Sequence, residues 1–387
     1  MDKVHLYAGF ASSPLLVTLS IPFILYLLYH LILFPLFRSD LRSIPGPVLA
    51  KLTDLHRLLL VRTGSAHEHH LRLHQRYGPL VRLGPNNVSI GSPAAIPVLY
   101  NTRTRYPKSA FYPVMGNVAH GKVVPTIFST RDESVHEMMK RPIAQVYAMT
   151  NLKTYEPLVE STESFFFGKL EKLADEGRTV DLGTWLHWFA TDVIMEITFG
   201  KRFGFLEREE DVDGIIKTVE GGFRWIISWC QQNVQAGSDS TAITLTAVIY
   251  HLLKNPDSMK TLLAELDNAH LPSPVPWDIA HKLPYLDACI KEALRMNPAI
   301  GIPLERVVPA GGIEICGKYF QGGTVLGVNA WVAHQDKKVY GEDAALWRPG
   351  RWIEASEDHR KEMERALFAV SSSTDPQLLL HRRWALL

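Results

Sequence analysis

The sequence predicts a mainly α-helical fold with small β-sheets, placed behind one N-terminal membrane-spanning helix. Apolar residues recur at helical spacing over 185–199, 242–253 and 284–296. Short β-branched runs lie between glycine and proline turns at 80–90 and 307–328. A long uncharged stretch near the N-terminus supplies the membrane-spanning part.

The composition excludes several classes of protein. The 387 residues are 46% hydrophobic and 21% charged, with a formal net charge of +1. Such a chain is too apolar to be disordered and too neutral for a nucleic-acid partner to be expected. The three cysteines, Cys230, Cys289 and Cys316, form no CxxC pair, which argues against a zinc ribbon or a disulfide scaffold and favours a reducing compartment.

The N-terminal stretch is long enough to cross a membrane. Residues 4–37 contain no Asp, Glu, Lys or Arg, and the mostly apolar run over 15–37 can span a bilayer core. We predict a lumenal N-terminus over 1–9 and a retained transmembrane anchor over 10–37. A secretory signal peptide is the alternative, but its apolar region is shorter and precedes a small-residue cleavage site.

The flanking charges set the orientation of this anchor. Arg38, Arg42 and Lys51 outnumber Lys3 on the other side, so the body should face the cytosol. This predicts a single-pass protein of the endoplasmic reticulum membrane. Residues 38–48 form an elbow around a Pro-Gly-Pro sequence, which is stiff because each proline fixes its own φ.

The body begins with two short strands, over 80–83 and 88–90, joined by a Gly-Pro-Asn-Asn turn. The helices over 242–253 and 284–296 are each followed by an Asn-Pro pair, which ends a helix. Paired glycines and β-branched residues over 307–328 predict short hairpins.

A histidine cluster precedes the first strand. It comprises His67, Glu68, His69, His70 and His74. His70 and His74 share one helix face, so a metal site is one interpretation, but the HExxH pattern is absent. The favoured interpretation is a polar helix face in water.

Three patterns in order carry more information. Glu292 and Arg295 stand three apart on an otherwise apolar helix, which alone indicates only a surface salt bridge. The sequence Ala-Gly-Ser-Asp-Ser-Thr over 236–241 opens the helix upstream, and Trp-Arg-Pro-Gly-Arg-Trp over 347–352 follows downstream. In this order the chain resembles the cytochrome P450 family of haem-thiolate monooxygenases, over roughly 44–369. It is most similar to the microsomal type of fungal secondary metabolism, which includes pisatin demethylase.

The resemblance implies a cytochrome P450 fold over 49–370 and a structural ion network. Glu292 and Arg295 match the family's ExxR motif, and Arg351 matches its third member. The three are expected to form a buried network that supports the haem-side core. Losing one member should cost about 3 to 5 kcal/mol.

The resemblance also implies catalytic residues on the central helix. Asp239 and Ser240 match the acid and the following hydroxyl that relay protons to iron-bound dioxygen. The family usually has threonine at the position of Ser240, and Thr241 stands next to it.

Four basic residues match family contacts to the haem propionates. His136 and Lys140 match a pattern of an aromatic residue or histidine followed four residues later by a basic residue, and Arg141 is the substitute for Lys140. Arg306 matches a second propionate contact. An ordinary surface role is the alternative for each of them.

The metal ligand of the family is missing. The family carries a Phe, Gly, Arg and Cys loop near its C-terminus, whose thiolate is the fifth iron ligand. After Ala369 this chain departs from that pattern, and no cysteine follows Cys316. Cys289 and Cys316 are interpreted as buried thiols, and His381 is a weak alternative ligand because imidazole donates less charge than thiolate.

A second departure is internal. The family has a long helical lid between a helix ending near Cys230 and the motif at Ala236, but only 231–235 stand here. This predicts an internal deletion near 230/231 and a shortened central helix. With a non-family tail over 371–387, it fits mis-joined exons and a shifted reading frame. A shortened isoform is the alternative.

The function expected of the complete form is oxidation of a lipophilic small molecule, such as a secondary metabolite, with O₂. Haem would be the cofactor, and electrons would come from NADPH through a membrane-bound cytochrome reductase. The chain as written should be inactive. The alternatives are a non-catalytic anchored remnant that acts as a binding or interaction protein, and an anchored hydrolase, which lacks support because no G-x-S-x-G elbow is present.

Overall fold

The structure is a computed structural model. It describes residues 14–29, 38–101, 106–119, 122–144, 151, 153–214 and 228–368. The predicted lumenal N-terminus over 1–9 and the predicted tail over 371–387 lie outside these ranges.

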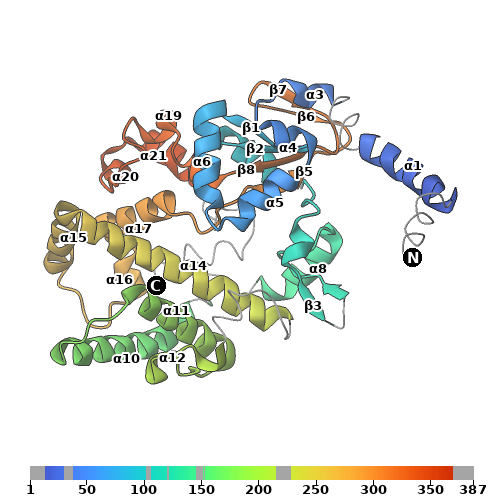
Figure 1. Cartoon of the computed structure of the whole chain (residues 1–387). Coiled ribbons are helices and arrows are strands. Elements are labelled where there is room, and N and C mark those ends of the chain that lie inside the picture. The colour runs from blue at the N-terminus through green and yellow to red at the C-terminus, as the bar shows by residue number, and fades with distance from the viewer. Residues whose placement is uncertain are drawn as a thin grey trace, which may run out of the picture.

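The described chain is mainly helical, as the sequence predicts, and its helices fall into a short N-terminal group and a longer group around α14 (Figure 1). The first group is α1 (Pro14–Leu28), α3 (Ser39–Arg42), α4 (Val48–Leu52), α5 (Leu55–Arg62), α6 (Ala66–Tyr77), α7 (Ile96–Leu99) and α8 (Glu133–Ile143). The second is α10 (Glu156–Asp175), α11 (Leu182–Phe199), α12 (Phe205–Arg208), α14 (Ser228–Lys254), α15 (Pro256–Ala269), α16 (Trp277–Ala280) and α17 (Pro284–Met296). Four short helices follow: α18 (Ala330–Ala333), α19 (Lys337–Tyr340), α20 (Arg351–Glu354) and α21 (Glu357–Ala366).

A four-stranded mixed sheet forms a separate layer beside α5 and α6 (Figure 1). Its order is β1 (Leu80–Gly84), β2 (Asn87–Ile90), β8 (Val325–Val328) and β5 (Leu304–Val307), with β2 and β8 parallel and the other pairs antiparallel. The strands expected over 80–83 and 88–90 are therefore present. Two hairpins complete the β structure: β3 (Asn117–Ala119) with β4 (Lys122–Val124), and β6 (Ile313–Ile315) with β7 (Lys318–Phe320).

The helices pack around α14, which lies against α11 along much of its length and also contacts α15 and α17 (Figure 1). Helix α17 has the bounds that the sequence predicts. Proline is tolerated at its first position, where an N–H would have no helical partner, and the helix stops at the Asn-Pro pair that follows Met296.

Helix α14 corrects one expectation. The sequence comparison predicts a helix that ends near Cys230 and a short one that begins close to Ala236, whereas a single helix runs from Ser228 to Lys254. The segment between Ser228 and Ala236 contains neither glycine nor proline, so nothing in it interrupts the backbone hydrogen bonds. The predicted junction at 230/231 therefore lies inside a helix.

The N-terminal apolar stretch contains α1, a helix of 15 residues. Within the described ranges no helix is both long and apolar enough to cross a membrane. The span predicted over 10–37 is therefore not found, and its two ends, 10–13 and 30–37, fall outside those ranges.

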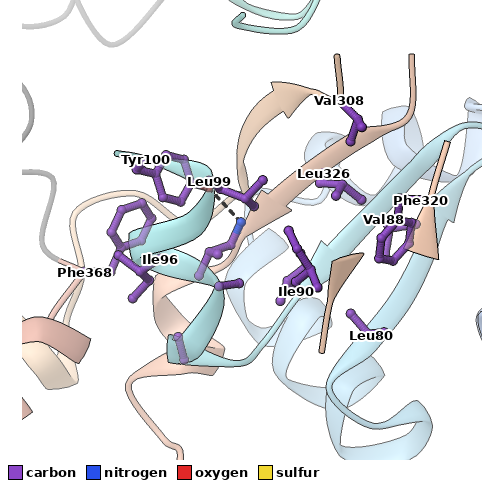
Figure 2. Close-up of a cluster of buried hydrophobic side chains, with 14 of the residues drawn as sticks. Leu80, Val88, Ile90, Ile96, Leu99, Tyr100, Val308, Phe320, Leu326 and Phe368 are labelled. Carbon is purple, nitrogen blue, oxygen red and sulfur yellow. Dashed lines mark hydrogen bonds between the residues drawn. The ribbon is translucent and has the colours of Figure 1, made fainter. Parts of the chain in front are cut away.

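A buried apolar cluster joins the sheet to the end of the described chain. Figure 2 shows Ile90 and Leu326 from two strands of the sheet, with Tyr100 and Phe368 stacked at one side. The rings of Tyr100 and Phe368 are 4.6 Å apart between centroids. Tyr100 is also tied to the sheet, because its hydroxyl donates to the Leu304 carbonyl at 2.6 Å and accepts from the Val328 N–H at 2.8 Å.

Replacing Tyr100 with phenylalanine is expected to lower the free energy of unfolding by about 1 to 3 kcal/mol. The ring would still pack, but a buried carbonyl and a buried N–H would each lose a partner. Denaturant unfolding of the two proteins measures the difference. Equal midpoints and slopes would mean that these two hydrogen bonds contribute nothing net.

The histidine cluster also differs from its favoured interpretation. His70 and His74, on α6, are only 2% and 6% exposed, so their face of the helix is buried and not in water. His74 Nε2 lies 2.8 Å from Ser89 Oγ and its Nδ1 lies 2.9 Å from the Gly78 carbonyl. Burial lowers the pKa of His74 to about 4. No group of three metal-ligating side chains occurs anywhere in the described ranges.

Candidate functional site

The most strongly organised polar site lies where α17 meets α20. Glu292 receives a two-pronged ion pair from Arg295, with N···O distances of 2.8 and 2.9 Å, and a further contact from Arg351 Nε at 3.1 Å. All three side chains are buried, the carboxylate completely. The structure thus brings together the three residues that the ExxR comparison singles out.

Backbone carbonyls take the remaining donors of the two arginines. Arg295 donates to the carbonyls of His334 at 2.9 Å and Ala344 at 2.5 Å. Arg351 donates to the carbonyl of Tyr340 and to Asp343 Oδ1, the latter at 2.9 Å. The network therefore fixes the chain from α18 to α20 against α17.

Charge balance keeps this site ionised. Burial by itself would raise the pKa of Glu292, but the hydrogen bond from Arg295 and the charges of Arg295 and Arg351 outweigh it and lower that pKa below its ordinary value. The backbone N–H of Arg348 adds a bond of 2.9 Å. The two carboxylate oxygens thus have partners on several sides.

Sequence reasoning misses one member of this network. Trp352 Nε1 donates to Glu292 Oε2 at 2.9 Å, and Trp352 is 2% exposed. Its place directly after Arg351 is a signal that could have found it, because a buried indole N–H needs an acceptor.

The catalytic residues expected on α14 point in different directions. Asp239 Oδ1 lies 3.0 Å from His187 Nε2 of α11. Ser240 donates to the Ala236 carbonyl one turn back, at 2.7 Å. Thr241 faces the apolar space between α10, α11 and α14.

Two cavities separate these residues. Asp239 and His187 line a cavity of about 470 Å³ beside α11, whereas Thr241 and Gly237 line another of about 350 Å³. The structure therefore does not gather Asp239 and Thr241 into one cavity. Sequence reasoning also misses His187, whose partner stands 52 positions away.

The residues expected to bind haem propionates lie on two separate elements. His136 is on α8, with Nδ1 3.1 Å from Glu133 of the same helix. Lys140 is half-buried one turn later, and Arg141 is exposed.

Arg306 lies on β5 among aromatic rings. Its guanidinium donates to the Tyr112 hydroxyl at 2.8 Å and lies 5.0 Å from the ring centroid of Tyr100. No printed contact joins it to α8 within the part of the chain that the structure describes.

A haem-thiolate group would need a cysteine thiolate below the iron. Cys289 is buried on α17, as expected, and burial, with the nearby carboxylates Glu265 and Glu292, raises its pKa to about 12, so it stays a thiol. Cys316 was expected to be buried but is exposed, at the turn between β6 and β7. Neither lines the cavities at Asp239 and Thr241, so the side chains that the structure describes do not fit a haem-thiolate group.

Comparison with known proteins places the chain in a family. The model of the family described as cytochrome P450 matches two stretches, 45–235 and 230–367. These stretches together span most of the chain.

Fungal proteins are the similar relatives. The cytochrome P450 monooxygenase cicH of Emericella nidulans is 39% identical, covering 83% of this chain and 80% of the relative. A cytochrome P450 monooxygenase of Aspergillus terreus is 34% identical over 94% of this chain and 90% of the relative. The cytochrome P450 monooxygenase mpaDE' of Penicillium brevicompactum is 35% identical, and the match spans about half of its length, 49%. The chain belongs to the cytochrome P450 family.

Proposed function

We propose that the complete form of this protein inserts one oxygen atom from O₂ into a lipophilic small molecule of secondary metabolism. By family it is a haem-dependent monooxygenase. In the proposal, electrons come from NADPH through a membrane-bound reductase. The observation that carries it is the intact buried network of Glu292, Arg295 and Arg351, which fixes the haem-side core while the family match runs on both sides of it.

The chain as it stands is proposed to lack this activity. The described cysteines do not fit the iron ligand, and the sequence has no cysteine after Cys316. Asp239 and Arg306 are satisfied by protein partners, His187 and Tyr112, in the arrangement seen here.

An internal segment of about 80 residues is proposed to be missing. The alignment with the Emericella protein is 399 positions long but uses only 83% of this chain, so roughly 80 positions are filled by the relative alone. The two stretches that match the family model meet at 230–235, which supports a junction there.

We also propose that the protein is held at the endoplasmic reticulum membrane with its body in the cytosol. Supporting observations are the uncharged N-terminal stretch and the exposed apolar side chains of α4 and α5. Among these, Val48 is 75% exposed and Leu58 is 64% exposed. Such side chains suit contact with an apolar surface.

The second candidate function is that of a non-catalytic anchored remnant that binds a partner or a small molecule. The lack of a fitting iron ligand among the described residues favours it. Haem incorporation separates the two candidates, because a remnant has no need of haem.

A chimera tests the proposal. The segment of the Emericella relative that has no counterpart here is inserted at 230/231, and the relative's C-terminal segment replaces everything after Leu367. We expect the chimera to bind haem with thiolate ligation, seen in the Soret band of its reduced carbon monoxide complex, and to consume NADPH with a reductase.

The unmodified chain is the control and should show neither property. Two chimeras with one repair each separate the contributions of the two segments. Monooxygenation by the unmodified chain would contradict the proposal that it is inactive, and a doubly repaired, folded chimera without thiolate-bound haem would contradict the proposal for the complete form.

A further inference from the structure

A cavity of about 650 Å³ lies on the sheet side of the molecule, away from the α14 motif. Its walls come from α5, α6, the β1–β2 turn, the segment 109–114 and the start of β5. They are largely apolar, and include Leu58, Phe111, Ile302 and Val325. This cavity is large enough for a small organic molecule.

One ionised group, the Glu305 carboxylate, lies in the wall and already has its own partners. It is 4% exposed and accepts hydrogen bonds from Arg57, from Asn87 Nδ2 at 2.8 Å and from Ser109 Oγ at 2.5 Å. Side chains alternate along a strand, so the next residue, Arg306, points to the opposite face, toward Tyr100 and Tyr112. The cavity is therefore separated from the residues expected to meet haem.

Two polar atoms in this cavity wall have no partner among the described residues. They are His70 Nδ1 and Asn87 Oδ1, on side chains that are 2% and 3% exposed. The Asn87 amide cannot turn over to remove the problem, because its Nδ2 is held by the Glu305 carboxylate. Buried polar atoms without a partner are rare and cost about 1 to 3 kcal/mol each, so a ligand that pairs with them recovers that energy.

The chemistry of the two atoms selects the kind of ligand. Burial, with the nearby positive charges, lowers the pKa of His70 to about 3, so its ring is neutral at pH 7. Asn87 Oδ1 can only accept, and a neutral imidazole nitrogen accepts or donates according to its tautomer. Glu305 is already paired with Arg57, so no net charge awaits a counter-ion.

We propose that this cavity is a second small-molecule site, which binds an uncharged and mainly apolar molecule whose hydroxyl group donates to Asn87 Oδ1 and pairs with His70 Nδ1. The proposal goes beyond the monooxygenase function and needs no haem, so it stands or falls independently of the iron ligand.

A matched pair of ligands tests it directly. Equilibrium dialysis of the purified full chain at pH 7 compares 2-naphthol, which carries a hydroxyl donor, with 2-methoxynaphthalene, which has the same rings but no donor. We expect 2-naphthol to bind about five- to tenfold more tightly, the value of one hydrogen bond to a buried acceptor. Equal affinities, or no binding of either, would overturn the proposal and leave the cavity to water.

A matched pair of variants locates the binding. Ala110 and Ala94 are both exposed alanines, but only Ala110 lines the cavity. Ala110→Trp should weaken both ligands at least tenfold, and Ala94→Trp should leave them unchanged. Equal effects of the two variants would place the bound ligand elsewhere and overturn the assignment.

A third variant tests the polar contact itself. His70→Phe keeps a flat, buried ring, and its loss of preference for 2-naphthol over the methyl ether is the expected result. A merely structural role of His70 would weaken both ligands alike and keep their ratio, which would contradict the proposed pairing. Should this variant not fold, the Ala110 and Ala94 pair still decides the matter.

Discussion

Replacing Glu292 with alanine is expected to lower the free energy of unfolding by about 3 to 5 kcal/mol, because two buried guanidinium groups would lose their shared carboxylate. Trp352 Nε1 and the Arg348 N–H would lose an acceptor at the same time. Guanidinium unfolding followed by far-ultraviolet circular dichroism measures the change.

Glu342→Ala is the matched control. Glu342 also pairs with a cation, Lys337, at 2.8 Å, but its side chain is 87% exposed, so the loss should be close to zero. A Glu292→Ala protein that unfolds together with this control would show that the buried network contributes no more than a surface ion pair.

The effect of Glu292→Ala should depend on pH. The pKa of Glu292 in the folded protein is lowered below its ordinary value of 4.5, so its contribution is complete above pH 4.5 and is lost as the pH falls through the lower, folded value. The difference between wild type and variant should therefore be largest near neutral pH and shrink in acid.

Asp192→Ala is the second large effect, with an expected loss of about 3 kcal/mol or more. Asp192 is completely buried on α11 and accepts four backbone N–H groups, those of residues 203, 204, 205 and 206, at 3.0 to 3.4 Å. Alanine would leave these donors without an acceptor where α12 begins. The same denaturant unfolding measures the loss.

Asp181, at the start of the same helix, supplies the control. It accepts from the Gly183 N–H at 3.1 Å but is exposed, so Asp181→Ala should cause only the smaller loss of an exposed N-cap. Equal losses for the two variants would contradict the role assigned to burial.

Acid should affect the Asp192 variant in the opposite sense to the Glu292 variant. Burial outweighs the hydrogen bonds and raises the pKa of Asp192 above its ordinary value of 3.8. Its contribution is complete below pH 3.8 and is lost as the pH rises through the folded value. The loss caused by Asp192→Ala should therefore grow as the solution becomes acidic.

Local signals explain what could be predicted from the sequence. The bounds of α17 follow from a proline that is tolerated at its start and an Asn-Pro pair after its end. The network around Glu292 follows from a motif whose three members keep their spacing. In both cases the information lies in neighbouring residues or in a fixed order.

Contacts between distant segments account for what could not be predicted. Nothing in α6 itself indicates that Ser89 will cover His74, so the burial of that face could not be read from its histidines. Arg306 was singled out, but its neighbour Glu305 was not, because the partners of Glu305 stand about 200 or more positions earlier in the chain.

The opposite surroundings of Glu305 and Arg306 also act as an electrostatic key for strand register. A slip of β5 by one residue would turn the carboxylate toward the electron-rich faces of Tyr100 and Tyr112, and the guanidinium toward Arg57. Both new encounters are repulsive. Alternative pairings of β5 with β8 are thus disfavoured by charge as well as by the apolar pattern, which gives the short strand one defined alignment.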